Sequence, residues 1–395
     1  MDHRAPPKGL IIVTGMAFYL PLPGVIYQVL HYMTGLRRLG YDVYYVEDSY
    51  RWVYDTSIDD IVGDATPNVA ILSAVFDRYG FGGKWAYRSE LDANGCFGLD
   101  ASGIVRLYRE ADAMLNVTGQ DLRGDQLLCR RRIYIESDPF ATQVRVSQGD
   151  AVESARLAAH DTHFTFGENI GAADCRIPET SIRWLPTRQP VDAELWKPPS
   201  GNARNAARRS YSTITSWVNH VDSVVYEGER YFWQKDREFE RFAELPKRSP
   251  ARFELASNGG EYVPRIMSDN GWNQVSVRDV AGDVESYRRY VWSSRAEFTV
   301  ARDQYVRPVT GWFSDRSACY LAAGRPVITQ ETGFSKFLPT GQGLFAFSEM
   351  EDILTAVEAI EADYDANSRA AREIGREYFA AEKVVGSLME RADLA

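Results

Sequence analysis

Cysteine is scarce in this sequence, and long apolar segments are absent. Zinc ligation by paired cysteines is excluded because no two of them form a C-x-x-C pair, and so few cysteines do not build a disulfide framework. We therefore expect a reducing, cytoplasmic environment. No apolar run is long enough to cross a bilayer, so we expect no membrane span. The four cysteines among the 395 residues are Cys96, Cys129, Cys175 and Cys319.

Positive charge is also in deficit. Lys and Arg number 45 against 55 Asp and Glu, which gives a formal net charge of −10. Proteins that bind nucleic acids usually present a basic face, so this balance predicts no nucleic-acid partner. It still allows a nucleotide site, because a few cations and backbone N–H groups are enough to hold a phosphate.

The beginning of the chain has the pattern of a parallel α/β sheet. Leu10–Thr14 is a continuous apolar run, typical of a strand that is buried on both faces. Val25–Leu39 has apolar residues at helical spacing, Gly40 ends that helix, and Asp42–Val46 is a second strand. This strand–helix–strand order predicts the opening of a doubly wound sheet.

A proline-rich segment divides the chain, whose length suits two domains better than one. Pro186–Pro199 contains four prolines and Ser200–Ser210 is small and polar, so we place the domain boundary here. The α/β pattern resumes with a strand at Tyr211–Val218 and ends with two helical segments, Met350–Asp363 and Asn367–Arg391. By pattern alone, a two-domain dehydrogenase or a periplasmic-type binding protein also fits.

The most informative stretch is a strand, a helix start, a second strand and a turn in the second half. We predict strands at Glu297–Ala301 and Pro326–Thr329, a helix that begins at Ser314, and a turn over Gln330–Gly333. Carboxyl ends of parallel strands form the edge at which such sheets bind ligands. The N–H groups of the helix start, with the nearby guanidinium of Arg316, suit a phosphate.

This stretch resembles the donor-binding half of glycosyltransferases with the GT-B fold. It reads GWFSDR from Gly311, YLAAGRPV from Tyr320 and QETGF from Gln330, which is similar to predicted bacterial glycosyltransferases. The resemblance covers most of residues 9–390 and is strongest over Arg295–Phe347.

The resemblance implies two Rossmann-like doubly wound domains that face each other across a cleft. Residues 1–190 would form the acceptor-binding domain, and residues 205–372 the nucleotide-sugar-binding domain. Residues 373–395 would form a C-terminal helix that packs back on the first domain. Such a cleft usually closes on binding, with the segment 186–210 as its hinge.

The implied activity moves a hexosyl or deoxysugar unit from a UDP, dTDP or GDP sugar to a hydroxyl or amine. The acceptor would be a small molecule or a cell-surface group, with no cofactor besides the donor co-substrate. Retaining members carry two glutamates at positions that correspond to Gly311 and Cys319, so we expect inversion. No Asp-x-Asp pair follows a strand, so we expect no metal. A homodimer is compatible with the sequence.

Three candidates for donor binding lie at the helix start. Arg316 would bind the diphosphate, while Asp315 would accept a sugar or ribose hydroxyl or hold Arg316 in place. Ser314 would be the N-cap, and a purely structural cap is the alternative. Trp233 and Lys235 are further candidates for the nucleotide pocket, since a base stacks well on an aromatic face.

The other donor candidates lie in the turn and at the end of an earlier strand. Gln330 and Glu331 would hold sugar hydroxyls, while Thr332 and Gly333 would offer N–H groups to phosphate. Trp217 would stack on the base. An ordinary strand-to-helix turn and a core tryptophan are the alternatives.

Acceptor binding is expected in the loop after the first strand. Its candidate residues are Gly15, Met16, Phe18 and Gly24. The loop lacks the G-x-G-x-x-G spacing of dinucleotide-binding proteins, which disfavours a dehydrogenase. It also lacks the histidine that is the general base in many inverting members. His31 comes later, inside the helix, where a structural role is expected.

The candidate general base is Asp138, which follows a predicted strand and precedes Pro139. Inverting transfer needs one group that takes the proton of the acceptor. Glu136 and His163 are the other candidates. Because Asp before Pro is also a common turn residue, a structural role is the alternative.

Two other functions fit the same fold. A nucleotide-sugar epimerase would hold the donor without a second substrate, and a non-catalytic nucleotide-sugar-binding protein would keep the donor pocket without a base. Consumption of the donor distinguishes the three functions. An epimerase would consume the donor without an acceptor, a glycosyltransferase would consume it only with an acceptor, and a binding protein would not consume it.

Overall fold

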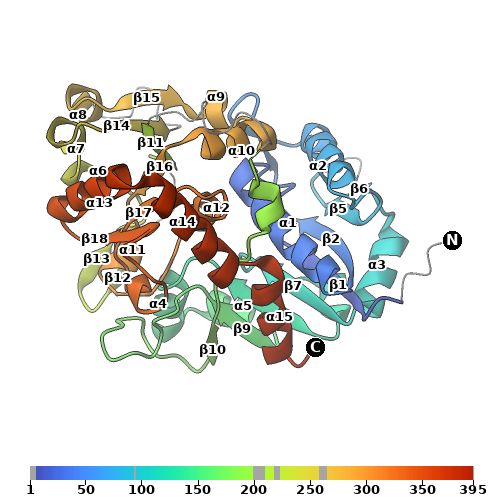
Figure 1. Cartoon of the computed structure of the whole chain (residues 1–395). Helices are drawn as coiled ribbons and strands as arrows, with labels where there is room; N and C mark the ends of the chain where they lie inside the picture. The colour runs from blue at the N-terminus through green and yellow to red at the C-terminus, as the bar shows by residue number, and fades with distance from the viewer. Residues whose placement is uncertain (1–5, 93–94, 199–209, 218–222, 258–264, 395) are drawn as a thin grey trace.

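The structure is a computed structural model that describes residues 6–92, 95–198, 210–217, 223–257 and 265–394 (Figure 1). Each half of the chain builds one large sheet. Two short hairpins, β3–β4 (Val53–Asp55 and Asp60–Val62) and β12–β13 (Val224–Tyr226 and Glu229–Tyr231), lie outside these sheets.

The first sheet is parallel except at one edge, where β6 pairs antiparallel with β5. Buried side chains of β1 alternate between two core clusters: Ile11 and Val13 join one, and Ile12 joins the other. Because both faces are covered, apolar residues are favoured throughout this strand, which explains the continuous run in the sequence. The strands in spatial order are β10 (Trp184–Pro186), β9 (Thr162–Thr165), β8 (Arg132–Glu136), β7 (Ala113–Val117), β1 (Leu10–Thr14), β2 (Asp42–Ser49), β5 (Trp85–Ser89) and β6 (Cys96–Phe97).

Helix α1 (Pro23–Arg38) connects β1 to β2. Pro23 stands in its first turn, where a missing N–H is tolerated, and Gly40 follows its end with a φ of +95°. The same helix contacts α10 and α12 of the second half, so it forms part of the interface between the two sheets. The other helices of the first half are α2 (Thr66–Arg78), α3 (Ala101–Glu110), η1 (Gly124–Leu128), α4 (Ala141–Ser147) and α5 (Ala151–Ala158).

The second sheet is parallel throughout and has the Rossmann strand order 3-2-1-4-5-6 when its own strands are counted along the chain. Its strands in spatial order are β15 (Asn273–Ser276), β14 (Arg252–Ser257), β11 (Ser210–Thr215), β16 (Ala296–Thr299), β17 (Val327–Gln330) and β18 (Leu344–Phe347). Its helices are α6 (Asp236–Arg241), α7 (Leu245–Arg248), α8 (Arg265–Asp269), α9 (Val277–Ala281), α10 (Val284–Ser293), α11 (Asp303–Val306), α12 (Asp315–Ala322), η4 (Phe334–Lys336) and α13 (Met350–Ala362).

The C-terminal segment forms two helices where one was predicted over Asn367–Arg391: α14 (Tyr364–Tyr378) and α15 (Ala381–Arg391). The break arises because the main chain pairs with Val191. The N–H of Val191 donates to the carbonyl of Phe379, and the N–H of Ala381 donates back to the Val191 carbonyl. After this break α15 packs against α1 (Figure 1).

The described part of the predicted hinge is firmly packed. It includes η2 (Ala193–Trp196), and Trp196 is fully buried against Tyr27, with a ring-centroid distance of 4.8 Å. Residues 199–209 of this segment lie outside the described ranges. We keep the domain boundaries at 1–190, 205–372 and 373–395 as a proposal. In the part of the chain that is described, no helix has both the length and the apolar character needed to cross a bilayer.

Candidate functional site

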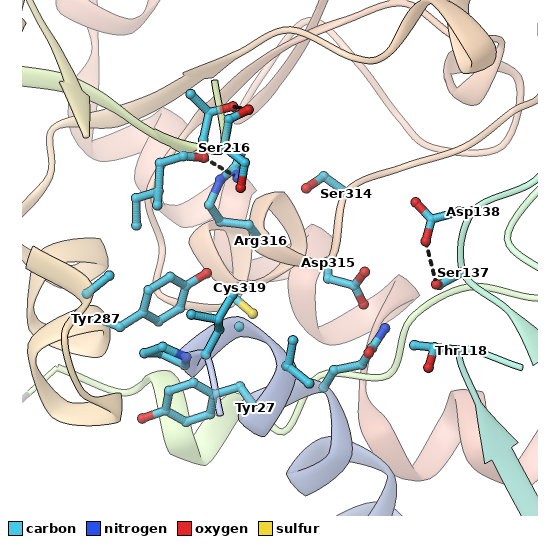
Figure 2. Close-up of a pocket in the computed structure, with 18 of the residues that line it drawn as sticks. Tyr27, Thr118, Ser137, Asp138, Ser216, Tyr287, Ser314, Asp315, Arg316 and Cys319 are labelled. Carbon is cyan, nitrogen blue, oxygen red and sulfur yellow. Dashed lines mark hydrogen bonds between the residues drawn. The ribbon is translucent and has the colours of Figure 1, made fainter. Parts of the chain in front are cut away.

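A cavity of about 410 Å³ lies between the two sheets, where the carboxyl ends of their strands face each other (Figure 2). In each sheet the first strand lies between the second and a later strand: β1 lies between β2 and β7, and β11 lies between β14 and β16. The crossover direction reverses there, and ligands bind at such a point. On one side the cavity is lined by residues that follow β1, β7 and β8. On the other side it is lined by residues that follow β16, by the end of β11 and by the start of α12. Representative lining residues are Met16, Thr118, Asp138, Thr215, Arg302 and Asp315.

Asp138 lies at the wall of this cavity and links the two halves. Its Oδ1 accepts a hydrogen bond from Arg302 Nη1 at 2.6 Å and another from the hydroxyl of Tyr305. Its Oδ2 accepts a bond from the Ser137 hydroxyl at 2.8 Å (Figure 2). The carboxylate is thus committed to three donors, two of them from the second half of the chain.

Arg316 reaches the cavity, but its guanidinium is bonded to the second sheet. Nε donates to Glu297 at 2.6 Å, Nη2 to the hydroxyl of Thr299 at 2.8 Å, and Nη1 to the carbonyl of Ile214 at 2.5 Å. The Glu297 side chain is fully buried. Arg316 therefore ties α12 to β11 and β16, and its predicted diphosphate contact would have to displace these bonds.

Lys235 and Arg302 line the cavity together with Arg316. Within the described ranges no carboxylate comes within the 4.0 Å ion-pair distance of Lys235 Nζ. Burial, and then the charges of Arg316 and Arg302, lower the pKa of Lys235 well below its ordinary value. The Arg302 guanidinium lies 3.8 Å from the ring centroid of Trp233. An anion in the cavity would relieve the repulsion between these cations.

Asp315 begins α12 and points toward the cavity, opposite Asp138 (Figure 2). Burial, reinforced by the negative charge of Asp138, raises its pKa to about 7. The neighbouring Gln28 amide and Arg316 act in the opposite direction. Ser314 is the N-cap residue, but its side chain makes no capping hydrogen bond. Its hydroxyl therefore stays available at the cavity wall.

The turn after β17 lies outside the cavity lining. The Glu331 carboxylate accepts the N–H groups of Thr332 and Gly333, at 3.0 and 2.5 Å, so the groups predicted to hold phosphate are already bonded. The Thr332 hydroxyl donates to the carbonyl of Trp312. Gln330 accepts the N–H of Ala301 at 3.0 Å. In this conformation the turn supports the loop after β16.

The predicted acceptor residues separate into two groups. Met16 and Gly24 line the cavity. Phe18 is fully buried in an aromatic cluster, with its ring centroid 5.0 Å from that of Tyr87, and Gly15 lies beside a smaller depression at the end of β1. Trp217, predicted to stack on the base, is buried and stacks on a phenylalanine of α6.

The two alternative bases and His31 have structural surroundings. Glu136 is buried and accepts hydrogen bonds from Gln143 and Thr165, both at 2.6 Å. His163 is not part of the cavity lining, and its Nε2 bonds to a backbone carbonyl at 2.8 Å. His31 lines the cavity, but burial lowers its pKa to about 4, which makes it a weak base at neutral pH.

Sequence reasoning passed over Arg302 and Thr118 as site residues. Arg302 comes directly after the predicted strand Glu297–Ala301, and Thr118 comes directly after the largely apolar run that forms β7, so position alone could have indicated them. The sequence indicated a role for Lys235 less clearly, because the residues that bury it and the cations near it belong to distant segments of the chain. Among the residues that the structure describes, no group of three or more His, Cys, Asp or Glu side chains is placed to hold a metal. The expectation of metal independence stays a prediction.

Comparisons with known proteins identify the fold. No family model and no curated protein matches the sequence. Solved structures do match over nearly the whole chain. An alpha-glucosyltransferase in complex with UDP-glucose and abasic-site DNA has a TM-score of 0.57 at 12% identity, over 97% of this chain and 99% of that one. HepE from Anabaena, in complex with UDP and glucose, has a TM-score of 0.59 at 9% identity, over 98% and 100%. AviGT4, a glycosyltransferase of avilamycin A biosynthesis, has a TM-score of 0.51 at 12% identity, over 98% and 97%.

These matches show that the chain has the GT-B fold of glycosyltransferases, with two Rossmann-like domains, as the resemblance implied. They also correct one expectation. The prediction of no nucleic-acid partner is wrong, because the matched alpha-glucosyltransferase was solved in complex with DNA. A net charge summed over the chain does not describe the local surface that meets a nucleic acid.

Proposed function

We propose that this protein is a glycosyltransferase that uses a nucleotide-sugar donor. The observation that carries the proposal is the cavity at the facing switch points of two Rossmann-like sheets, with Lys235 and Arg302 on its wall. A diphosphate fits this wall because Lys235 has no carboxylate partner within the described ranges, and Arg302, which donates to Asp138, lines the same cavity. The matched structures with UDP support a nucleotide donor of this kind.

In this proposal the donor diphosphate lies between Lys235, Arg302 and the first turn of α12. Ser314 and Asp315 then face the transferred sugar. The acceptor enters from the first half of the chain, past Met16 and Gly24. Catalysis comes from holding donor and acceptor together and from stabilising the charge that develops on the leaving diphosphate.

The test is donor binding by calorimetry and thermal shift, with UDP, dTDP, GDP and their sugars. We expect one nucleotide series to bind wild type, and Lys235→Met to weaken that binding by about tenfold or more, since one buried charge-assisted contact contributes about 1.5–3 kcal/mol. Lys247→Met is the matched control, because Lys247 is exposed on α7. Absence of binding by every panel member would contradict the donor site. Equal binding by Lys235→Met would contradict its placement.

Activity assays separate this function from an epimerase and from a binding protein. Transfer requires an acceptor, epimerisation changes the donor alone, and a binding protein leaves the donor intact. Because matched structures of this fold include an enzyme bound to DNA and one of avilamycin A biosynthesis, the acceptor panel should contain DNA as well as small molecules. We further propose inversion without a metal, which product anomers formed in the presence of EDTA would test.

None of the four cysteines, all of which the structure describes, is part of a disulfide. We further propose a cytoplasmic location.

A further inference from the structure

We propose that Asp315, and not Asp138, takes the proton of the acceptor. This inference rests on the proposed function. The O–H bond of the acceptor breaks and its proton passes to the Asp315 carboxylate, while the acceptor oxygen bonds to the anomeric carbon. The bond from that carbon to the diphosphate oxygen breaks, and its electron pair leaves with the nucleoside diphosphate beside Lys235 and Arg302.

The hydrogen bonds of Asp138 argue against a role as base. Arg302 and Tyr305 both donate to its Oδ1, and Ser137 donates to its Oδ2. A proton arriving from the acceptor would have to compete with these donors for the oxygen lone pairs, and it would break the charge pairing with Arg302. Asp138 is better suited to orient Arg302 than to receive a proton.

Asp315 has the opposite surroundings. It lines the cavity on the wall of the second half, and no arginine or lysine makes an ion pair with it in the described part of the chain. The groups that face it are Asp138 from the loop after β8, Gln28 and Tyr32 from α1, and Arg316 and Cys319 from its own helix.

The balance of these groups leaves Asp315 able to accept a proton near neutral pH. Burial and the charge of Asp138 raise its pKa to about 7, and Gln28 and Arg316 oppose this shift only in part. A general base works best when its pKa lies near the working pH. Asp138 is then a positioning residue with two effects: it holds Arg302, and its charge increases the proton affinity of Asp315.

The first test measures the Asp315 carboxyl directly. In protein labelled with 13C at the aspartate carboxyl, the resonance lost in Asp315→Asn identifies Asp315. We expect its titration midpoint near 7, and we expect Asp138→Asn to lower that midpoint because a negative neighbour is removed. Asp365→Asn, on the exposed surface of α14, is the control and should leave the midpoint unchanged. A midpoint below about 6, closer to an ordinary aspartate, would overturn the inference.

The second test measures turnover of the donor that binds in the nucleotide panel, with water or an identified acceptor. Loss of a general base should lower kcat of Asp315→Asn by about 10²–10⁴-fold while donor affinity is kept, and Asp315→Glu should restore part of the rate. The rate of wild type should rise with pH through the Asp315 midpoint, because only the ionised carboxylate accepts the proton. Retention of kcat within about tenfold in Asp315→Asn would overturn the inference. Failure of every donor to bind would instead reject the proposed function.

Discussion

At the scale of single residues, the charged side chains of this site form two groups: those that are paired with another charged residue of the chain, and those that are not. Arg316 and Glu297 form a buried pair, and Asp138 is bonded to Arg302. Lys235 and Asp315 lack such close ion pairs in the described ranges, and their pKa values are shifted in the directions expected for buried groups. Lys235 and Asp315 are therefore available for ligand chemistry without the loss of a structural ion pair.

We expect Arg316→Ala to destabilise the fold more than it affects donor contacts. It would leave the carboxylate of Glu297 buried without its cation, and breaking such a pair costs about 3–5 kcal/mol. The loss should appear as a lower urea midpoint in equilibrium unfolding. Arg369→Ala removes an exposed arginine from α14 and should change stability by less than about 0.5 kcal/mol. An Arg316→Ala protein as stable as wild type would show that the pair does not form.

At the scale of elements, the contact between α1 and α15 attaches the end of the chain to the first half. A Cβ atom at Gly35 of α1 would lie 3.0 Å from the carbonyl oxygen of Ala381, at the first turn of α15. The absence of a side chain at Gly35 therefore allows the helices to approach closely. The strand pairing of Val191 with the segment between α14 and α15 fixes the same region.

We expect Gly35→Leu to force α15 away from α1 and to cost about 1–3 kcal/mol, as overpacking typically does. Equilibrium unfolding would measure the cost, and faster hydrogen exchange confined to α15 and its neighbours would locate it. Gly386→Ala is the control on the facing helix, because its Cβ would meet Leu39 at an ordinary 3.8 Å. That change should be neutral or stabilising by up to about 1 kcal/mol. A Gly35→Leu protein with unchanged exchange in α15 would contradict this packing.

At the scale of the whole molecule, contacts between the loops of the two halves hold the cleft in the observed arrangement. The indole N–H of Trp312 donates to the carbonyl of Ser137 at 2.9 Å, and Lys336 pairs with Asp174 at 2.5 Å. Gly311 has a φ of +77°, and a Cβ there would come within 2.5 Å of the Asn169 nitrogen. The Trp312 contact is made to Ser137, the residue before Asp138, so domain arrangement and site geometry are coupled.

We expect Trp312→Phe to loosen this junction without unfolding the protein. It removes one hydrogen bond, which contributes about 1 kcal/mol, while the ring can still stack on Tyr305. Hydrogen exchange should accelerate in the loops after β8 and β16, and donor affinity should fall severalfold. Exchange that rises uniformly over both sheets would indicate general destabilisation and contradict a local role.

The sequence by itself determined the strands and helices whose patterns are local. The apolar run Leu10–Thr14 is β1, with the predicted bounds, because a strand covered on both faces needs apolar side chains at every position. The stretch from Glu297 onward predicted the start of α12 correctly. The resemblance of this stretch to glycosyltransferases implied the GT-B fold, which the matched solved structures show.

Only the tertiary structure decided which polar residues meet in the cavity and which are already bonded. Thr332 and Gly333 give their N–H groups to Glu331, and Arg316 is bonded to Glu297, although all were predicted to hold phosphate. The pattern of a helix start or a turn indicates available N–H groups, but it does not show the partner that a distant segment supplies. The burial of Asp315 and its proximity to Asp138 depend on the packing of two domains, and a local sequence pattern contains no information about that distance.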